Sequence, residues 1–330
     1  MTAPDTHVLD ASTDEDAVVT TAAAAPAATL SVVVPAHDEA RTLGASLAAL
    51  AAAAGREVPD VVVVANGCTD ATADVARAAG VRVVELAEPS KAAALSAGDV
   101  AATAFPRVYL DADIRLTPGT LEALAATLRR DGVLVASPRV VFDTSRSSWP
   151  VRAFYAAYRE LPYVREGLVG LGVYGMSAAG RARFGDFPRV TSDDLFVQRM
   201  FSPDERAVSG GEFVVAAPRD LRNLLKVRTR TARGNAELGG REVDDLVRTP
   251  NDTDGAGGRT DPSGPGESTD GGGRRFGRTT SSTTTALLRL AMVRPRLIPS
   301  FVVYTAVTTA SRVSARRRQS TAWQRDTSTR

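Results

Sequence analysis

Short apolar runs alternate with Ala- and Leu-rich amphipathic segments along the first 142 residues. Continuous runs such as LSVVVPA (30–36) and DVVVVAN (60–66) are typical of strands buried on both faces. The segments between them carry apolar residues at helical spacing, and Gly55 and Gly80 end two of them. The pattern predicts strands at 30–36, 60–66, 81–86, 107–113 and 132–142, and helices at 39–55, 69–80, 90–104 and 117–130. Because strands that alternate with helices form βαβ units, we expect an α/β fold with a mostly parallel sheet flanked by helices.

The remaining segments differ in composition. The Ala-, Thr- and Asp-rich residues 1–28 have no period and predict a disordered tail. A catalytic domain is expected over 29–238, with a ligand-binding half at 29–142 and a second half at 143–238. Residues 239–285 have the low complexity of a flexible linker, and 286–330 predict a basic amphipathic tail.

Composition excludes several kinds of site. The one cysteine, Cys68, excludes an intramolecular disulfide, and two histidines, His7 and His37, exclude a multi-histidine zinc site. The N-terminus lacks a basic secretory signal, and no apolar run reaches the roughly 18 residues of a spanning helix. We therefore expect a cytoplasmic protein.

The basic charge is concentrated at the C-terminus. Residues 286–330 hold nine arginines and one acid, Asp326. Such clusters are attracted to anionic lipid, which predicts peripheral contact with the inner face of the cell membrane. The alternative is a helix that packs on the catalytic domain and has a loose basic end. The net charge of +2 gives no indication of a nucleic-acid partner.

Polar residues cluster where three predicted strands end. The first strand ends near Pro35, His37, Asp38 and Glu39, the second at NGCTD (66–70), and the fourth at Asp111 and Asp113. Each group alone could consist of turn and cap residues. Ligands of open parallel sheets bind outside the carboxyl ends of the strands, so the three groups together predict a site.

Asp111 and Asp113 point to chemistry with oxygen ligands. On a strand, residues two apart share a face, and two like charges there need a neutralising partner. Mg²⁺ or Mn²⁺ takes one or two carboxylates plus substrate phosphates. A nucleotide-bound substrate is therefore expected.

The motifs LSVVVPAHDEARTL, VVVVANGCTDATADVA, SKAAALSAG and VYLDADIRLTPGTLEAL occur in this order. In order and spacing the chain resembles glycosyltransferase family 2 over roughly residues 30–235. The resemblance implies the GT-A fold, which is a Rossmann-like sheet, and transfer of a sugar, usually with inversion, from a nucleotide diphosphate sugar.

The resemblance also implies roles for single residues. Asn66 stands where many members have an Asp that reads the base; because Asn both donates and accepts hydrogen bonds, UDP and GDP donors stay open. Lys91 would approach the donor, although an exposed helix lysine is the alternative. The metal ligands would be Asp113 and Asp111. The implied donor-binding residues are Pro35, His37, Glu39, Asn66, Asp70, Lys91, Asp111 and Arg230.

The family's general base is the second acid of a pair, which corresponds here to Asp194 after Asp193 in PRVTSDDLFVQRMF (188–201). Capping of a helix N-terminus is a compatible alternative. Downstream, KVRTRTARGN (226–235) predicts a basic loop that closes over the diphosphate, with Arg230 as the favoured ligand and a solvated charge run as the alternative.

Other functions fit the motifs less well. GLGVYG (170–175) spells a dinucleotide fingerprint but lies far downstream of the first strand, so we interpret it as part of the acceptor side. A nucleotidyltransferase would need a Gly- and Arg-rich loop after the first strand, where PAHDEARTL stands. A non-catalytic sugar-nucleotide-binding domain is the second alternative. The sequence favours a metal-dependent, hexosyltransferase-like enzyme of cell-envelope glycan or glycolipid synthesis, with a carbohydrate or lipid-linked acceptor.

Overall fold

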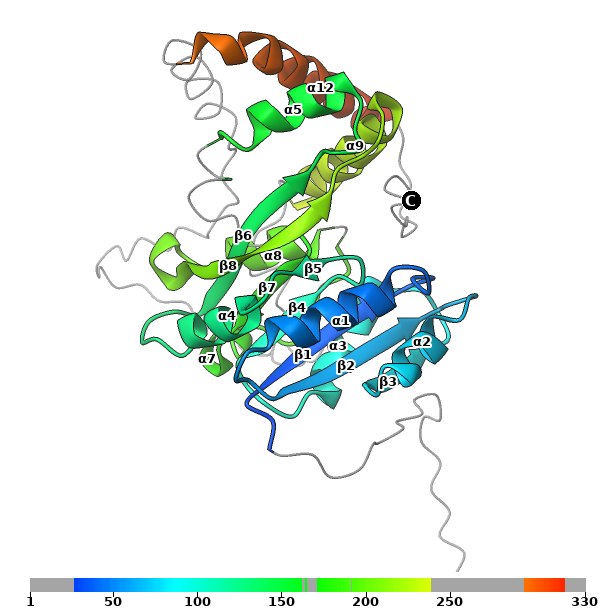
Figure 1. Ribbon diagram of the computed structural model, residues 1–330, viewed down its shortest axis with the longest axis vertical. Coiled ribbons are helices and arrows are strands. Elements are labelled where there is room, and N and C mark those ends of the chain that lie inside the picture. Colours follow the sequence, from blue (N-terminus) through cyan, green and yellow to red (C-terminus); the bar gives the residue numbers. More distant parts are fainter. Residues whose placement is uncertain (1–26, 162–163, 165–170, 191, 239–293, 318–330) are drawn as a thin grey trace, which may run out of the picture.

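Eight strands form one sheet in the order β3-β2-β1-β4-β7-β6-β8-β5 (Figure 1). The computed structural model describes residues 27–161, 164, 171–190, 192–238 and 294–317. The strands are β1 Leu30–Ala36, β2 Pro59–Asn66, β3 Arg82–Leu86, β4 Arg107–Leu110, β5 Arg115–Leu116, β6 Val135–Asp143, β7 Val173–Met176 and β8 Arg206–Ala216. The predicted α/β class with a mostly parallel sheet is confirmed, because β1, β2, β3 and β4 pair in parallel and β6 pairs in parallel with β8.

Both faces of the parallel half are covered, as the continuous valine runs predict. Helices α1 (Leu43–Ala53), α2 (Thr72–Ala78) and α4 (Thr120–Leu128) share one core with Val32 and Val34 of β1. On the opposite face Val33 packs with Leu95 of helix α3 (Lys91–Ala101). Alternate residues of β1 therefore belong to different cores.

The second half of the chain extends the same sheet. Strand β7 lies antiparallel between β4 and β6, and β5 pairs antiparallel with β8. Helices α7 (Ala178–Arg181) and α8 (Asp193–Met200) follow β7, and a 3-10 turn η1 (Pro203–Glu205) leads into β8. Since β4 pairs directly with β7, the two predicted halves share one continuous sheet.

Helices α5 (Trp149–Tyr158), α9 (Leu221–Leu238) and α12 (Ile298–Arg317) form a separate layer at one end of the molecule (Figure 1). A 3-10 turn, η3 (Pro295–Leu297), precedes α12. The core of this layer is aromatic: the ring of Phe154 stacks with those of Tyr304, at 5.3 Å between centroids, and Tyr158, at 5.7 Å. The described part of the C-terminal tail thus packs on the catalytic domain.

Two predicted elements were wrong. The fourth strand ends at Leu110 rather than Asp113, because Ile114 N–H donates to the carbonyl of Asp111 and closes a turn there. The basic segment 226–235 is not a loop but lies inside α9. Its Lys, Arg and Ala residues are good helix formers, and Leu224 and Leu238 are buried at either side of it.

Several other predictions concern residues outside the described ranges. The proposed disordered tail, apart from its last two residues, and the whole linker at 239–285 lie there. Within the described part of the chain, no helix has the length and apolar character needed to cross a bilayer.

Candidate active site

Polar contacts connect the carboxyl ends of β1, β2 and β4. At the first junction, His37 Nδ1 lies 2.8 Å from the carbonyl oxygen of Asn66. At the second, Ser90 N–H, just before α3, donates to Asn66 Oδ1 at 2.8 Å. Lys91, the first residue of α3, then reaches Asp111 after β4. The three sequence clusters therefore meet at one edge of the sheet.

The loop after β1 is fastened to the loop after β2. Asp38 has a positive φ of 52° and accepts a hydrogen bond from Thr69 N–H at 2.6 Å. Asp70 accepts from the N–H groups of Ala40 at 3.2 Å and Thr72 at 3.0 Å, and Thr72 Oγ1 accepts from Glu39 N–H. In this structure Asp70 and the backbone of Glu39 shape the turn. Pro35 is buried within β1.

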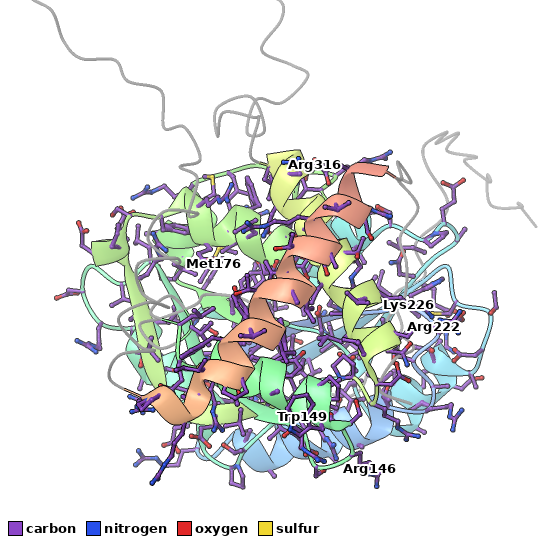
Figure 2. The ribbon with its side chains drawn as sticks, turned by 90° about the horizontal axis from the view of Figure 1, so that it is seen from above. Arg146, Trp149, Met176, Arg222, Lys226 and Arg316 are labelled. Carbon is purple, nitrogen blue, oxygen red and sulfur yellow. The ribbon has the colours of Figure 1, made fainter. Side chains whose placement is uncertain are left out.

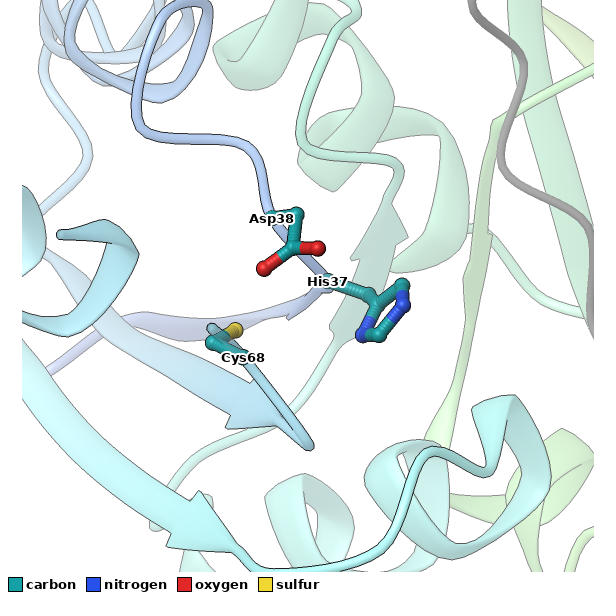
Figure 3. Close-up of side chains that lie close together, drawn as sticks. All are labelled: His37, Asp38 and Cys68. Carbon is teal, nitrogen blue, oxygen red and sulfur yellow. The ribbon is translucent and has the colours of Figure 1, made fainter. Parts of the chain in front are cut away.

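His37, Asp38 and Cys68 bring their side chains together at this junction (Figure 3). Their potential ligand atoms all lie within 4.8 Å of one another, and among the described residues this is the only such group of three. A histidine, a thiol and a carboxylate are softer ligands than the predicted oxygen set. The group does not include Asp111 or Asp113.

Asn66 ends β2 and is fully buried. Its Oδ1 is occupied by Ser90 N–H, whereas its Nδ2 has no hydrogen-bond partner in the structure. A pocket opens beside it at the ends of β2 and β3, lined by Ala65, Gly67, Cys68, Glu85, Leu86 and Ala87. Asn66 itself is not among the lining residues, but its Nδ2 remains a buried hydrogen-bond donor without a partner next to this part of the sheet edge.

Lys91 neutralises Asp111 in this structure. Its Nζ lies 2.8 Å from Asp111 Oδ1 and 2.8 Å from Asp193 Oδ1. Burial would lower the pKa of Lys91, but the two carboxylates outweigh burial and raise the pKa above the ordinary lysine value. Lys91 thus stays charged at neutral pH and ties the end of β4 to the start of α8. This is not the exposed helix lysine of the alternative interpretation.

The predicted acid pair opens α8, but its two members have different surroundings. Asp193 is buried and accepts a hydrogen bond from Tyr174 OH at 3.2 Å besides its ion pair with Lys91. Asp194 accepts from Leu171 N–H at 3.1 Å and Leu195 N–H at 2.7 Å. Burial and the neighbouring charge of Asp193 raise the pKa of Asp194, against the opposing effect of Lys91. A carboxyl with a raised pKa is a stronger base once it is ionised.

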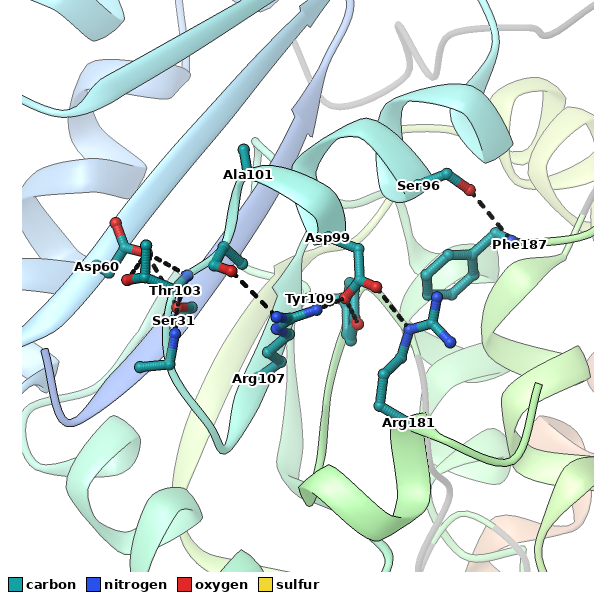
Figure 4. A network of polar contacts seen from close by, with 12 residues as sticks. Ser31, Asp60, Ser96, Asp99, Ala101, Thr103, Arg107, Tyr109, Arg181 and Phe187 are labelled. Carbon is teal, nitrogen blue, oxygen red and sulfur yellow. Dashed lines mark hydrogen bonds and ion pairs between the residues drawn. The ribbon is translucent and has the colours of Figure 1, made fainter. Parts of the chain in front are cut away.

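A polar network around Asp99 (Figure 4) packs against Tyr174, the residue whose hydroxyl donates to Asp193. The ring of Tyr174 stacks on that of Tyr109 at 5.1 Å, and Tyr109 OH donates to Asp99 Oδ1 at 2.6 Å. Arg107 and Arg181 hold Asp99 at 2.6 and 2.8 Å. Sequence reasoning missed this network, because its members come from α3, β4, β7 and α7 and no motif joins them.

The two proposed metal ligands lie in the turn after β4. Asp113 is exposed, and Asp111 is half-buried with one oxygen on Lys91. The described residues add no third His, Cys, Asp or Glu to this pair. Two carboxylates that need further oxygen ligands fit Mg²⁺ or Mn²⁺ held jointly with phosphates.

Arg230 lies on the exposed side of α9, in the layer that α9 forms with α5 and α12. Its neighbour Arg228 places its guanidinium over the rings of Tyr158 and Phe154, at 5.0 and 5.5 Å from their centroids. The segment therefore has a packing role that the sequence interpretation did not include.

Comparison with known proteins gives two kinds of match. Residues 31–184 match the model of "Glycosyl transferase family 2". No curated protein matches the chain. Solved structures include glucosyl-3-phosphoglycerate synthase from Mycobacterium tuberculosis with Mn²⁺ and UDP-glucose, which is 20% identical, with a TM-score of 0.47 and coverage of 64% of this chain and 78% of that one. The same synthase with Mg²⁺ and UDP gives the same identity and coverage, with a TM-score of 0.46.

The family match includes β1, β2, β4 and β7, and so it covers the cluster at Asn66, Lys91 and Asp111. Asp193 and Asp194 lie outside the match, nine and ten residues after its last residue. The match of residues 31–184 to the glycosyltransferase family 2 model confirms the resemblance that the sequence motifs indicated.

Proposed function

We propose that this protein is an inverting glycosyltransferase that uses a UDP- or GDP-linked sugar. The observation that carries the proposal is the ion-pair bridge Asp111–Lys91–Asp193, which joins the donor end of a family 2 domain to the acid pair of α8. The bridge brings a candidate metal-binding turn and a candidate base into one site.

The reaction follows from this arrangement. An acceptor hydroxyl oxygen forms a bond to C1 of the donor sugar while the bond between C1 and the diphosphate oxygen breaks. The electron pair of that bond leaves with the nucleoside diphosphate, and the hydroxyl proton passes to a carboxylate oxygen of Asp194. Attack from the side opposite the leaving group inverts the configuration at C1.

Backbone hydrogen bonds hold the carboxylate of Asp194, the proposed proton acceptor, in one orientation. The N–H groups of Leu171 and Leu195 hold the two oxygens of Asp194 in place. Asp193 is engaged by Lys91 and Tyr174, so it serves to position the site rather than to take the proton. A base whose pKa is raised toward the working pH is the more effective one.

Asp113, with the second oxygen of Asp111, would hold Mg²⁺ or Mn²⁺. When bound there, the cation acts as a Lewis acid that stabilises the leaving diphosphate. Lys91 engages one oxygen of Asp111, which leaves Asp113 as the principal ligand.

The donor base would enter beside Asn66, whose buried amide N–H₂ would donate to a carbonyl of uracil or guanine. We propose a carbohydrate or lipid-linked acceptor of cell-envelope glycan or glycolipid synthesis and a place at the cytoplasmic side of the membrane. The basic C-terminal layer supports the lipid-linked form.

Turnover of a panel of nucleotide sugars, with and without Mn²⁺ and candidate acceptors, tests the function. We expect Asp194→Asn to lower transfer by about 10² to 10⁴, the usual contribution of a positioned base, while donor binding is kept. Asp193→Asn, the matched change, should cost less transfer and more stability, because it removes one of the two carboxylates that pair with buried Lys91 and the charged acceptor of the Tyr174 hydroxyl.

A folded Asp194→Asn enzyme that works near the wild-type rate would exclude this base, and Asp193 or Glu212 would become the candidate. Donor binding without any turnover across the panel would instead indicate a non-catalytic binding domain.

The metal assignment has its own test. Asp113→Asn should abolish Mn²⁺-dependent stabilisation by nucleoside diphosphates in a thermal-shift assay, because a ligand that binds the folded state raises its stability. Asp131→Asn, at another exposed turn, is the control and should leave the shift unchanged. A full Mn²⁺-dependent shift in Asp113→Asn would contradict the assignment.

A further inference from the structure

The outer face of α12 is apolar where solvent exposure would favour polar residues. Phe301, Tyr304 and Val307 face the layer's core, whereas Ile298, Val302 and Val313 are exposed. Val302 keeps 63% of its surface. The exposed apolar residues follow one another at helical spacing, with the exposed Thr305 and Thr309 on the same side of the helix, so they form a largely apolar stripe along its outside.

An exposed tryptophan belongs to the same layer. Trp149, the first residue of α5, is 59% exposed. Figure 2 looks down on this layer and shows α12 crossing it, with Trp149 beside the helix. Tryptophan has an apolar ring and a polar N–H, a combination that suits the boundary between lipid and water.

Positive charge surrounds the stripe. Arg294 and Arg296 lie before α12, Arg312 and Arg316 lie near its end, and residues 294–317 contain no acid. Arg222 and Lys226 on α9 and Arg146 before α5 are also exposed in this layer (Figure 2).

Negative charge is sparse in the same layer. Glu160 pairs with Arg294 at 3.0 Å, Asp220 accepts from Asn223 N–H at the start of α9, and Glu237 is exposed near the end of α9. The outer face as a whole is therefore basic and partly apolar.

These properties select one kind of partner. A second copy would present the same arginines and repel. A nucleic acid would match the charge but leave Ile298 and Val302 without an apolar partner. An anionic bilayer accepts both kinds of residue, since arginines reach the headgroups while apolar side chains enter the acyl boundary.

We propose that the outer face of α5, α9 and α12 docks on an anionic lipid bilayer without crossing it. The docking residues are those of the α12 stripe together with Trp149 and the surrounding arginines. The inference concerns a surface remote from the acid pair and stands independently of the proposed reaction.

Co-sedimentation of the full chain with vesicles tests the proposal. We expect binding to phosphatidylglycerol–phosphatidylcholine vesicles, little binding to pure phosphatidylcholine, and weakening by salt. The double variant Arg312→Glu/Arg316→Glu should lose at least about 25-fold, because each basic residue contributes roughly fivefold near such a surface. Val302→Glu should lose about tenfold or more, because a charge replaces an apolar contact.

Matched controls separate the surface from general effects. Val100, on α3, is 87% exposed, and Arg130 is an exposed arginine after α4. Val100→Glu and Arg130→Glu should bind vesicles as the wild type does, and circular dichroism should show all variants folded.

Equal vesicle binding by Val302→Glu and the wild type would overturn the proposal, as would tight binding to pure phosphatidylcholine. The surface would be reassigned to nucleic acid if the wild type bound duplex DNA more tightly than vesicles and Val302→Glu changed neither DNA binding nor vesicle binding.

Discussion

Lys91 shares its charge between a carboxylate after β4 and one at the start of α8. Without it, Asp111, Asp193 and Asp194 would leave several negative charges in a partly desolvated space, which is costly. The lysine therefore sets how easily each nearby carboxyl ionises. Its charge also lowers the pKa of Asp194, in opposition to burial and Asp193.

The pH dependence of transfer follows from these shifts. Asp194 must be ionised to take a proton, and its pKa is raised. As the pH is lowered, kcat/KM should therefore begin to fall at a pH above the ordinary Asp pKa of about 3.9. Lys91→Met removes a charge that lowers this pKa and should move the acid limb to higher pH. Lys226→Met, at the chain's other lysine, should leave the limb in place.

The measurement is the pH profile of kcat/KM for the wild type, Lys91→Met and Lys226→Met. An acid limb at or below the ordinary Asp value, or one that moves to lower pH in Lys91→Met, would contradict the role given to Asp194.

Helix α3 packs so closely on β1 that the contact position on the helix, Gly98, has no room for a side chain. A Cβ on Gly98 would stand 2.3 Å from Val33 Cγ1, closer than real contacts allow. The helix begins at Lys91, so this close packing also sets where the lysine meets Asp111 and Asp193.

Gly98→Ala should therefore destabilise the protein by about 1–3 kcal/mol through overpacking. Gly44→Ala in α1 is the matched change, because its Cβ would meet Val75 at an ordinary 3.6 Å. It should be neutral or stabilising by up to about 1 kcal/mol, as is usual for Gly→Ala in a helix. Urea unfolding measures both, and a stabilised Gly98→Ala protein would show that α3 packs less closely than described.

The elements differ in how far the sequence could predict them. The strands at 30–36 and 60–66 were predictable because their valines are buried on both sides. Strand β8 was not, since its residues RAVSGGEFVVA are mostly exposed or half-buried and lack a clear period. Strand β4 ends at Leu110, sooner than its sequence suggests, because Ile114 N–H closes a turn onto the carbonyl of Asp111.

The candidate site also has a part that the sequence could predict and a part that it could not. The short motifs carry Asn66, Lys91 and Asp111, so a resemblance could locate them. The contact of Asp193 with Lys91, and the support from Tyr174 and Asp99, depend on packing between distant segments. No local pattern records such contacts.

The molecule as a whole is closed at one end by the C-terminal helix. Tyr304 of α12 is buried and stacks on Phe154 of α5, while Leu224 of α9 belongs to the same core. The layer therefore depends on a helix that is distant in sequence from its partners.

Tyr304→Ala should cost about 3–5 kcal/mol, the usual range for truncating a buried aromatic side chain. Val302→Ala, two residues away and exposed, should change stability by less than about 0.5 kcal/mol. Chemical denaturation followed by circular dichroism measures both changes. Equal, small effects would show that α12 is not packed on α5 and α9.

Because α12 lies far behind α5 and α9 in the sequence, the ribosome makes it well after the two helices on which it packs. A ribosome that adds about 5–20 residues per second needs roughly 4–16 seconds to proceed from the end of α9 to the end of α12. During that interval Phe154 and Tyr158 lack the helix that later covers them. The nascent chain thus carries an uncovered aromatic surface, available to chaperones or to other nascent chains, until α12 has been made.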